Sequence, residues 1–314
     1  MKRIHVMAAV IVGSDGRILL AKRAANQHQG GLWEFPGGKC EAGETREQAL
    51  DRELHEELGI RVTAARPLIQ VSHDYADKSV LLDVWRVTGF SGEPHGAEGQ
   101  PLAWVAPPAL SDYRFPAANL PIVSAAQLPD CYWVTAPEWT AEHALAQLTQ
   151  ALAVGAALIY WRLPQLSAAA YLHCAQQAAA LCAGRAQLML HGEQALLAQV
   201  PGAGWHLSAA QLQGFQGERP AGVRMAASCH DAAELALANQ LGVDFVTLSP
   251  LLQTASHPEA EPLGWAQAEQ LLKQCLSPAY LLGGVSPADL PQAWQVGAQG
   301  IAAIRGLWRG VGAA

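Results

Sequence analysis

Three glutamates, Glu53, Glu56 and Glu57, stand at helical spacing in the first part of the sequence. With 3.6 residues per turn they fall within about 100° of each other on a helix. Like charges at this spacing repel, and no lysine follows four residues on to relieve the repulsion. Such a pattern is usually a solvated acidic face, but the glycine-rich segment 36–38 upstream lets the backbone approach a ligand closely. We therefore expect the carboxylates to hold a hard divalent cation, typically magnesium that also coordinates substrate phosphates.

A helix must carry these acids, and its ends are marked in the sequence. Thr45 with Gln48 forms a capping-box pattern, and Gly59 supplies a C-terminal stop. Apolar residues recur at helical spacing between these ends and predict a buried stripe: Ala49, Leu50, Leu54 and Leu58.

The rest of the chain divides into two parts of different texture. Residues 4–12 and 17–22 are predicted strands joined by a hairpin at 13–16, residues 80–87 form another predicted strand, and residues 91–128 are proline-rich and irregular. From Cys131, eight short β runs alternate with helical runs, which predicts a (β/α)8 barrel. The β runs are 132–135, 158–162, 187–190, 204–207, 223–226, 244–248, 280–282 and 300–304. We place the boundary near Pro129, giving domains 1–128 and 129–314.

Composition limits the partners of this 314-residue chain. Its net charge is −7 and no lysine or arginine cluster is present, which argues against a polymeric nucleic acid. No run approaches the roughly 20 apolar residues that a membrane span needs. The chain starts without a signal-peptide pattern, and its six cysteines lack close pairs or metal spacing, so we expect reduced thiols and a cytoplasmic protein. The oligomeric state stays open.

Segment 32–60 resembles the Nudix box, G-x5-E-x7-R-E-U-x-E-E-x-G-U, where U is a bulky aliphatic residue. Every specified position is filled, by Gly38, Glu44, Arg52, Glu53, Leu54, Glu56, Glu57, Gly59 and Ile60. The resemblance implies an α/β class fold, an α/β/α sandwich with a mixed sheet. It also implies hydrolysis of a nucleoside diphosphate linked to another group, with Mg²⁺ as cofactor or Mn²⁺ as a substitute.

The same resemblance implies a role for each box residue. Glu53, Glu56 and Glu57 hold the cation, together with the carbonyl of Gly37 or Gly38. Arg52 orients a carboxylate, and Glu44 anchors the loop or a neighbouring ligand. Farther along the chain, Glu98 joins the metal cluster or acts as the general base. The choice of base, Glu53 or Glu98, stays open.

Over roughly residues 3–125 the chain resembles the MutT-type sanitising pyrophosphohydrolases. The resemblance lies in segments 21–25, 92–94, 98–101 and 115–119 in addition to the box. It implies hydrolysis of 8-oxo-dGTP and 8-oxo-GTP to the monophosphate and pyrophosphate. Asn119 and the backbone of Phe35 would contact the oxidised purine edge, and Arg23 the base or sugar. Two alternatives stay open: a Nudix enzyme for another diphosphate, such as a thiamine-pathway pyrophosphate, and a regulator with a vestigial hydrolase site.

The C-terminal part resembles thiamine phosphate synthases and TenI-like proteins, which are (β/α)8 barrels. The resemblance is clearest in segments 228–230, 242–250, 263–264, 282–285 and 297–306. A possible second site for a phosphorylated thiazole or thiamine ligand lies at strand ends, where barrel sites occur. Its residues are Arg162, His230, Thr254, Ser256, Gly283, Gly284 and Gly306, the glycines offering backbone N–H groups to a phosphate.

The synthase pattern is broken at several positions. An expected Gln-x-Arg-x-Lys reads Tyr160-Trp161-Arg162-Leu163-Pro164, and an expected Asn-Asp pair reads His191-Gly192. A further acid is replaced near Gln211 and a lysine by His257. We therefore expect no synthase activity. Three readings stay open: a thiazole phosphate isomerase with His230 as acid/base, a phosphometabolite sensor, or a structural and dimerising module.

Overall fold

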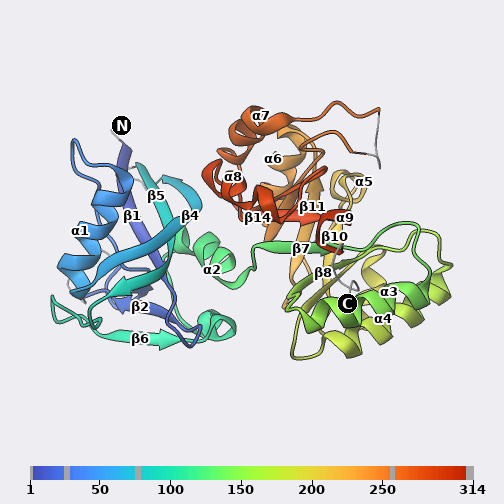
Figure 1. Ribbon diagram of the computed structural model, residues 1–314, viewed down its shortest axis with the longest axis horizontal. Coiled ribbons are helices and arrows are strands. Elements are labelled where there is room, and N and C mark those ends of the chain that lie inside the picture. Colours follow the sequence, from blue (N-terminus) through green and yellow to red (C-terminus); the bar gives the residue numbers. More distant parts are fainter. Residues whose placement is uncertain (1–2, 25–28, 75–78, 255–258, 309–314) are drawn as a thin grey trace. The chain divides into compact units, whose positions relative to one another are not determined.

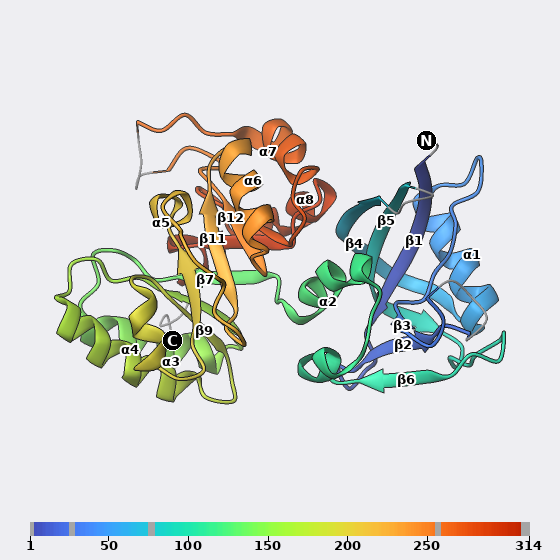
Figure 2. The same cartoon turned by 180° about the vertical axis from the view of Figure 1, so that it is seen from behind.

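The computed structural model describes residues 3–24, 29–74, 79–254 and 259–308. The chain splits into two compact units, Met1–Gln127 and Leu128–Ala314 (Figures 1 and 2). The division falls one residue before the boundary expected from the sequence. Within the described residues, no helix is both long and apolar enough to cross a bilayer.

The first unit contains two three-stranded sheets. One is mixed: β1 pairs parallel with β5, which pairs antiparallel with β4. The other is antiparallel, with β2 between β3 and β6. The strands are β1 (Arg3–Ile11), β2 (Ile18–Lys22), β3 (Trp33–Glu34), β4 (Arg61–Asp74), β5 (Ser79–Ser91) and β6 (Leu102–Val105).

Helices cover both faces of the mixed sheet. Successive side chains of β1 point to opposite faces, and apolar side chains on each face are buried by a helix. Met7 and Ala9 pack with α1 (Arg46–Leu58), whereas Ala8 and Val10 pack with α2 (Leu120–Gln127). Two 3₁₀ helices, η1 (Pro107–Asp112) and η2 (Ala117–Asn119), precede α2. The expected α/β/α sandwich with a mixed sheet is confirmed.

The ends of α1 are those predicted. Thr45 caps the helix and exchanges side-chain and backbone hydrogen bonds with Gln48, and Gly59 ends it in the left-handed conformation. The predicted apolar stripe of α1 is buried.

The predicted hairpin is wrong. The turn forms, since Gly13 N–H donates to the Arg17 carbonyl at 2.8 Å, but β1 and β2 share only the single bridge between Val12 and Ile18. The two strands belong to different sheets, because β1 is buried on both faces between α1 and α2 and takes β5 as its parallel neighbour. Region 91–128 is also less irregular than expected, since it contains β6, η1, η2 and α2.

The second unit is a closed barrel of eight parallel strands in chain order, which confirms the predicted barrel. Its strands are β7 (Cys131–Val134), β8 (Leu158–Trp161), β9 (Gln187–Leu190), β10 (Gly204–Leu207), β11 (Met225–Cys229), β12 (Phe245–Leu248), β13 (Ala279–Leu282) and β14 (Gly300–Ala303). The helices between them are α3 (Ala141–Ala153), α4 (Ala168–Cys182), η3 (Gln194–Ala198), α5 (Ala209–Gln213), α6 (Ala232–Leu241), α7 (Gly264–Leu272), η4 (Pro287–Asp289) and α8 (Leu290–Gln295), and α9 (Arg305–Trp308) follows the last strand.

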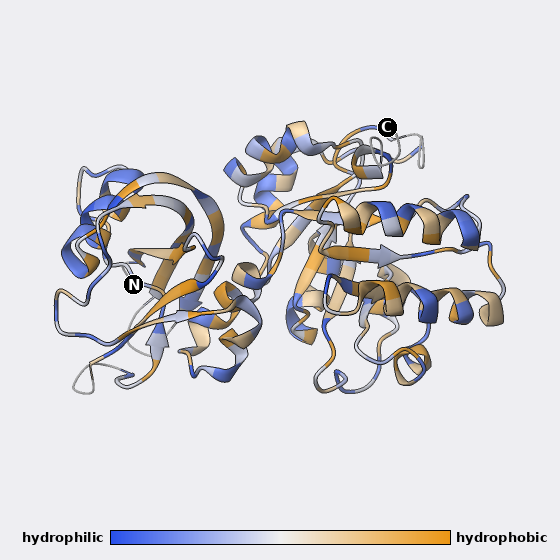
Figure 3. Cartoon of the chain, turned by 60° about the horizontal axis from the view of Figure 1, so that its bottom comes forward, coloured by the Kyte–Doolittle hydropathy of each residue, from blue (hydrophilic) through white to orange (hydrophobic). Residues whose placement is uncertain are grey.

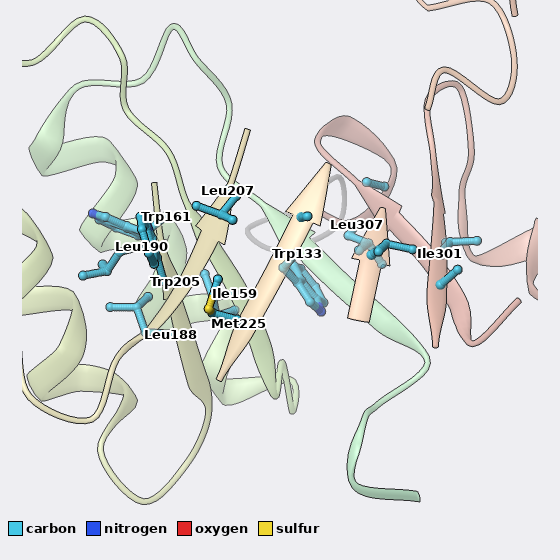
Figure 4. Packing of buried hydrophobic residues seen from close by; sticks show 14 of the residues in the cluster. Trp133, Ile159, Trp161, Leu188, Leu190, Trp205, Leu207, Met225, Ile301 and Leu307 are labelled. Atoms are coloured by element: carbon cyan, nitrogen blue, oxygen red, sulfur yellow. The ribbon is translucent and has the colours of Figure 1, made fainter. Parts of the chain in front are cut away.

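Two cores hold the barrel. Between strands and helices, Trp133, Trp161 and Trp205 pack among aliphatic side chains (Figure 4). Inside the ring of strands the filling is largely aromatic, with Tyr132 in contact with Tyr160, His206, Phe245 and Tyr280. Hydrophobic residues gather on the strands, and hydrophilic residues on loops and outer helix surfaces (Figure 3).

One buried carboxylate ties α1 to the mixed sheet. Asp83 on β5 is fully buried and accepts hydrogen bonds from five donor groups. Arg46, the first residue of α1, donates twice, at 2.6 and 2.7 Å, and its guanidinium lies over the Trp85 ring. His5, Gln70 and the Trp85 indole complete the set. The position of α1 on the sheet therefore depends on Asp83 as well as on apolar packing.

Replacing Asp83 with asparagine should loosen α1. Breaking a buried ion pair costs about 3–5 kcal/mol, and we expect about 2–3 kcal/mol here because the Arg46 side chain is 37% exposed and regains water. Hydrogen exchange of α1 and β5 amides should accelerate, with the barrel strands as internal reference. Asp112→Asn, at an exposed aspartate of the same unit, is the matched control. Unchanged protection in Asp83→Asn would contradict this role.

Candidate functional site

The glycine-rich loop 36–38 lies directly on the edge of β1. Met7 N–H donates to the Gly38 carbonyl at 2.7 Å, and Ala9 N–H to the Pro36 carbonyl at 2.8 Å. A Cβ on Gly37, whose φ is 146°, would lie 2.1 Å from the Met7 carbonyl oxygen. A Cβ on Gly38 would lie 2.1 Å from Glu53 Oε2. Position 37 therefore needs glycine for the strand contact, and a side chain at Gly38 would displace the Glu53 carboxylate.

The three acids of α1 are placed differently around this loop. Glu53 lies against Gly38 with its side chain 15% exposed, and Glu57 Oε2 accepts a hydrogen bond from Gly37 N–H at 3.0 Å. The Glu56 side chain is 58% exposed. Among the described residues, no three acidic, histidine or cysteine side chains already form a group able to hold a metal ion.

Arg52 is hydrogen-bonded to several acids of the site. Its guanidinium bonds Glu53 at 2.9 Å and Glu56 at 3.1 Å. It also makes two hydrogen bonds to Glu44, at 2.7 and 3.0 Å, and one to the Lys39 carbonyl at 2.9 Å. These bonds to Arg52 lower the pKa of Glu44 to about 2. Arg52 and Glu44 thus join the loop to α1, and a cation would compete with Arg52 for Glu53 and Glu56.

Glu57 lies in an environment that disfavours its own negative charge. Burial is the largest cause that raises its pKa, to about 7, and the charges of Glu34, Glu53 and Glu98 add to it, while the Gly37 N–H opposes the shift. A neighbouring cation reverses this effect, because opposite charge favours the ionised carboxylate. The donor set therefore fits a hard divalent cation.

Glu98 reaches this region through the loop after β5. The carbonyl of Glu57 accepts from Ala97 N–H at 3.0 Å and from Gln100 Nε2 at 2.9 Å, and Gln100 Oε1 in turn accepts from Glu98 N–H at 2.9 Å. These bonds fix Glu98 near the end of α1, where it is exposed. The geometry does not choose between Glu53 and Glu98 as a base.

A pocket of about 280 Å³ extends from the glycine loop. Arg23, Phe35 and Asn119 all line it, together with Gly37 and Gly38. Phe35 stacks on the Phe115 ring at 5.5 Å between centroids, which holds its backbone in place. The structure therefore brings the predicted nucleotide-contacting residues together beside the predicted metal loop.

Sequence reasoning missed Glu34, which also lines this pocket. Its carboxylate forms an ion pair with Arg23, and its charge acts on Glu57. Burial raises the pKa of Glu34, and Arg23 opposes that shift. A signal was available: Glu34 is a single acid between two aromatic residues, directly before the glycine loop.

The barrel carries two adjoining pockets at the C-terminal ends of its strands. The larger, about 530 Å³, is lined by Arg162, His230, Thr254 and Gly283, and also by Tyr160 and His191, which the sequence showed only as departures from the synthase pattern. The smaller, about 290 Å³, is lined by Gly284 and Gly306, and it shares Thr254 and Gly283 with the larger one. The predicted Ser256 lies outside the described residues.

His230 is exposed and is held mainly by backbone contacts. Its N–H donates to Glu234 at 2.7 Å, and its Nδ1 lies 2.7 Å from the Ser249 carbonyl oxygen. Since a carbonyl only accepts, Nδ1 carries a proton and Nε2 is the remaining nitrogen that can face a ligand. This arrangement orients the ring toward the pocket that it lines.

Known proteins resemble both units. Residues 7–125 match the NUDIX domain family, and residues 131–307 match the thiamine monophosphate synthase family, TMP-TENI. The 8-oxo-dGTP diphosphatase of Escherichia coli (strain K12) is 38% identical over 124 residues, which cover 40% of this chain and 96% of that protein. The CTP pyrophosphohydrolase of the same strain is 42% identical over 125 residues, or 40% of this chain and 92% of that protein.

The barrel family is also represented. A putative thiamine-phosphate synthase 2 of Aquifex aeolicus (strain VF5) is 38% identical over 77 residues, which cover 24% of this chain and 41% of that protein. These findings confirm both resemblances drawn from the sequence. The chain is thus a Nudix hydrolase, homologous to 8-oxo-dGTP diphosphatases, joined to a C-terminal member of the thiamine monophosphate synthase family.

Proposed function

We propose that the Nudix unit hydrolyses 8-oxo-dGTP and 8-oxo-GTP to the monophosphate and pyrophosphate. The observation that carries this proposal is the single pocket that joins Asn119, Phe35 and Arg23 to the glycine loop next to Glu53 and Glu57. Such a pocket can take a base at one end and a phosphate chain at the other. The reaction would remove oxidised purines from the nucleotide pool before they are incorporated into DNA.

The residues present fit a Mg²⁺ ion, with Mn²⁺ as a substitute. Glu53, Glu56, Glu57 and Glu98 would supply carboxylates, and Gly37 or Gly38 a carbonyl. When bound, the cation supplies charge neutralisation at phosphate oxygens and a more acidic water. Gly38 would leave room for the Glu53 carboxylate beside the loop. Glu53 or Glu98 would then accept a proton from the attacking water.

Asn119 is the proposed reader of the base. It ends η2, where its N–H is bonded to the Pro116 carbonyl, and it is half-buried at the pocket. A carboxamide offers a donor and an acceptor together, which suits a purine edge. A buried polar group left unpaired by the wrong base gives strong discrimination.

A second candidate is a Nudix hydrolase for another diphosphate. The 42% identity to a CTP pyrophosphohydrolase supports a pyrimidine nucleotide, and the attached barrel suggests a thiamine-pathway pyrophosphate. Release of pyrophosphate or phosphate from a panel with 8-oxo-dGTP, dGTP, CTP and thiamine diphosphate separates these candidates.

Asn119→Ala should abolish the preference for 8-oxo-dGTP over dGTP. One bidentate contact to a base is worth about 1–3 kcal/mol, so the ratio of the two kcat/KM values should fall by roughly 10- to 100-fold while Mg²⁺ dependence survives. Steady-state kinetics on both nucleotides measure this ratio. Equal efficiencies in the native protein would refute the substrate and leave the hydrolase assignment intact.

Glu53→Gln should abolish turnover of either nucleotide, whereas Glu47→Gln, at an exposed glutamate of the same helix, should not.

Glu57 predicts a pH-dependent affinity for the cation. With its pKa at about 7 in the folded protein and an ordinary value of 4.5, the folded state holds an extra proton between these values. Without cation, this group therefore makes stability fall as pH rises from about 4.5 to 7. Because ligands must be deprotonated, Mn²⁺ affinity should rise about tenfold from pH 6 to pH 8, measured by electron paramagnetic resonance. Glu57→Gln should weaken binding and remove the pH dependence; an equally steep profile in that variant would contradict the assignment.

We also propose that the barrel binds a phosphorylated small molecule, such as thiazole phosphate or thiamine phosphate, without synthase activity. Support comes from the smaller pocket, where Gly283 and Gly284 have φ of 110° and 71° and a Cβ on Gly306 would lie 2.4 Å from the Val285 carbonyl oxygen. Glycine at these positions allows close packing of the neighbouring backbone and adds no side chain to the pocket, whose backbone N–H groups could bind a phosphate.

A thermal-shift screen tests the barrel. Thiazole phosphate or thiamine phosphate should raise the melting temperature of the full chain, because a ligand that binds only the folded state stabilises it. Turnover of the ligand would identify an isomerase, and stabilisation alone a sensor. No shift with any of these ligands would refute binding and leave the barrel as a structural module.

A further inference from the structure

Tyr160 and His191 form a hydrogen-bonded pair in the wall of the larger barrel pocket. The Tyr160 Oη and His191 Nδ1 atoms are 2.9 Å apart. Tyr160 lies on β8 and His191 directly follows β9, its parallel neighbour. Both stand where the sequence departs from the synthase pattern, in place of a glutamine and an asparagine. The two departures therefore produce one new interaction.

The pair is fixed from below by the barrel core. The Tyr160 ring stacks on His206 at 4.1 Å between centroids, and His206 Nδ1 is 2.9 Å from the Tyr132 hydroxyl. His191 is held through its backbone, whose N–H donates to the Tyr171 hydroxyl at 3.1 Å.

Both members of the pair are uncharged near neutral pH. Burial, and then the charge of Arg162, lowers the pKa of His191, while burial raises the pKa of Tyr160. Nδ1 is used by the Tyr160 hydroxyl, and Nε2 of His191 has no hydrogen-bond partner among residues 3–24, 29–74, 79–254 and 259–308. Since the hydroxyl can donate or accept, Nε2 can present either a donor or an acceptor to a ligand.

The same pocket has an anion-binding side. Arg162 lines it, and among the residues that the structure describes no carboxylate lies within ion-pair distance of its guanidinium. Gly283 connects this pocket with the glycine-lined one. Lys273 is the only lysine after residue 129, and it pairs with Glu269 on α7. Arg305 also lines the glycine-lined pocket, and Glu261 lines the larger one. Two guanidinium groups and one carboxylate, with no lysine among the lining residues, suit one phosphate group better than a diphosphate.

We propose that the Tyr160–His191 pair determines the specificity of the barrel by hydrogen-bonding an uncharged polar group of a small monophosphate ester, whose phosphate lies toward Arg162 and the glycines. A ring nitrogen, carbonyl or hydroxyl would meet this requirement. The inference rests on the proposed binding function of the barrel and adds the residues that read the part of the ligand remote from the phosphate.

Isothermal titration calorimetry on the full chain tests the pair, with hydroxyethylthiazole phosphate and inorganic phosphate as probes and EDTA present throughout. His191→Phe should weaken binding of the thiazole phosphate about tenfold, because its ring nitrogen loses its partner, and leave inorganic phosphate within about twofold. Tyr160→Phe, which removes only a hydroxyl and keeps the ring stacked on His206, should show a smaller loss of the same kind. His173→Phe, at an exposed histidine of α4, is the matched control. Melting temperatures confirm that each variant is folded.

Other outcomes separate this proposal from the binding function. Unchanged thiazole phosphate affinity in both Tyr160→Phe and His191→Phe would overturn the role of the pair alone. An equal loss for both probes would also overturn it, since the pair would then support the anion side or the fold. If the native chain bound neither probe, the binding function of the barrel would fail, and the pair's role with it.

Discussion

The contact between the Glu53 carboxylate and Gly38 is the constraint on which the Nudix site depends. A single added Cβ would occupy the place of the carboxylate, so a side chain there would move Glu53 away from the loop. Because the same loop is fixed to β1 and its Gly37 N–H is bonded to Glu57, this packing also sets the distance between acids and backbone. The ability of the site to bind a cation therefore depends on how closely the acidic helix α1 and the glycine loop 36–38 approach each other.

Such an approach gathers negative charge, and the protein balances it in two ways. Arg52 neutralises Glu44, Glu53 and Glu56 through direct hydrogen bonds. Among the described residues, no guanidinium or ammonium group pairs with Glu57, and its burial near other acids favours the protonated form. An unbalanced buried acid is costly to folding and favourable to cation binding. The unfavourable burial of the Glu57 charge would therefore be relieved when a cation binds. The Asp83–Arg46 contact helps to hold α1 against the sheet.

The barrel shows the opposite solution. Its core is a network of tyrosine and histidine side chains in which His206 is fully buried, with a pKa lowered by burial to about 3. Hydrogen bonds between neutral groups, rather than ion pairs, connect the core to the pocket through Tyr132, His206 and Ser228. In the proposed binding site, this neutral wall beside Arg162 would select ligands by shape and hydrogen bonding as well as by charge.

The sequence by itself determined the elements whose signals are local. Capping residues and the apolar stripe gave α1, alternation of β and helical runs gave the barrel, and fixed spacing gave the Nudix box. Strand pairing was not local: β4 alternates poorly because it is bulged, and the turn at Gly13 joins two sheets rather than two paired strands. Only the tertiary structure decided that Glu34 meets Arg23, that Arg52 holds three acids at once, and that Tyr160 bonds His191 across 31 residues of sequence. Side-chain contacts of this kind depend on which strands become neighbours. The pairing of strands in turn depends on how the faces of each sheet are buried, which local sequence patterns do not show.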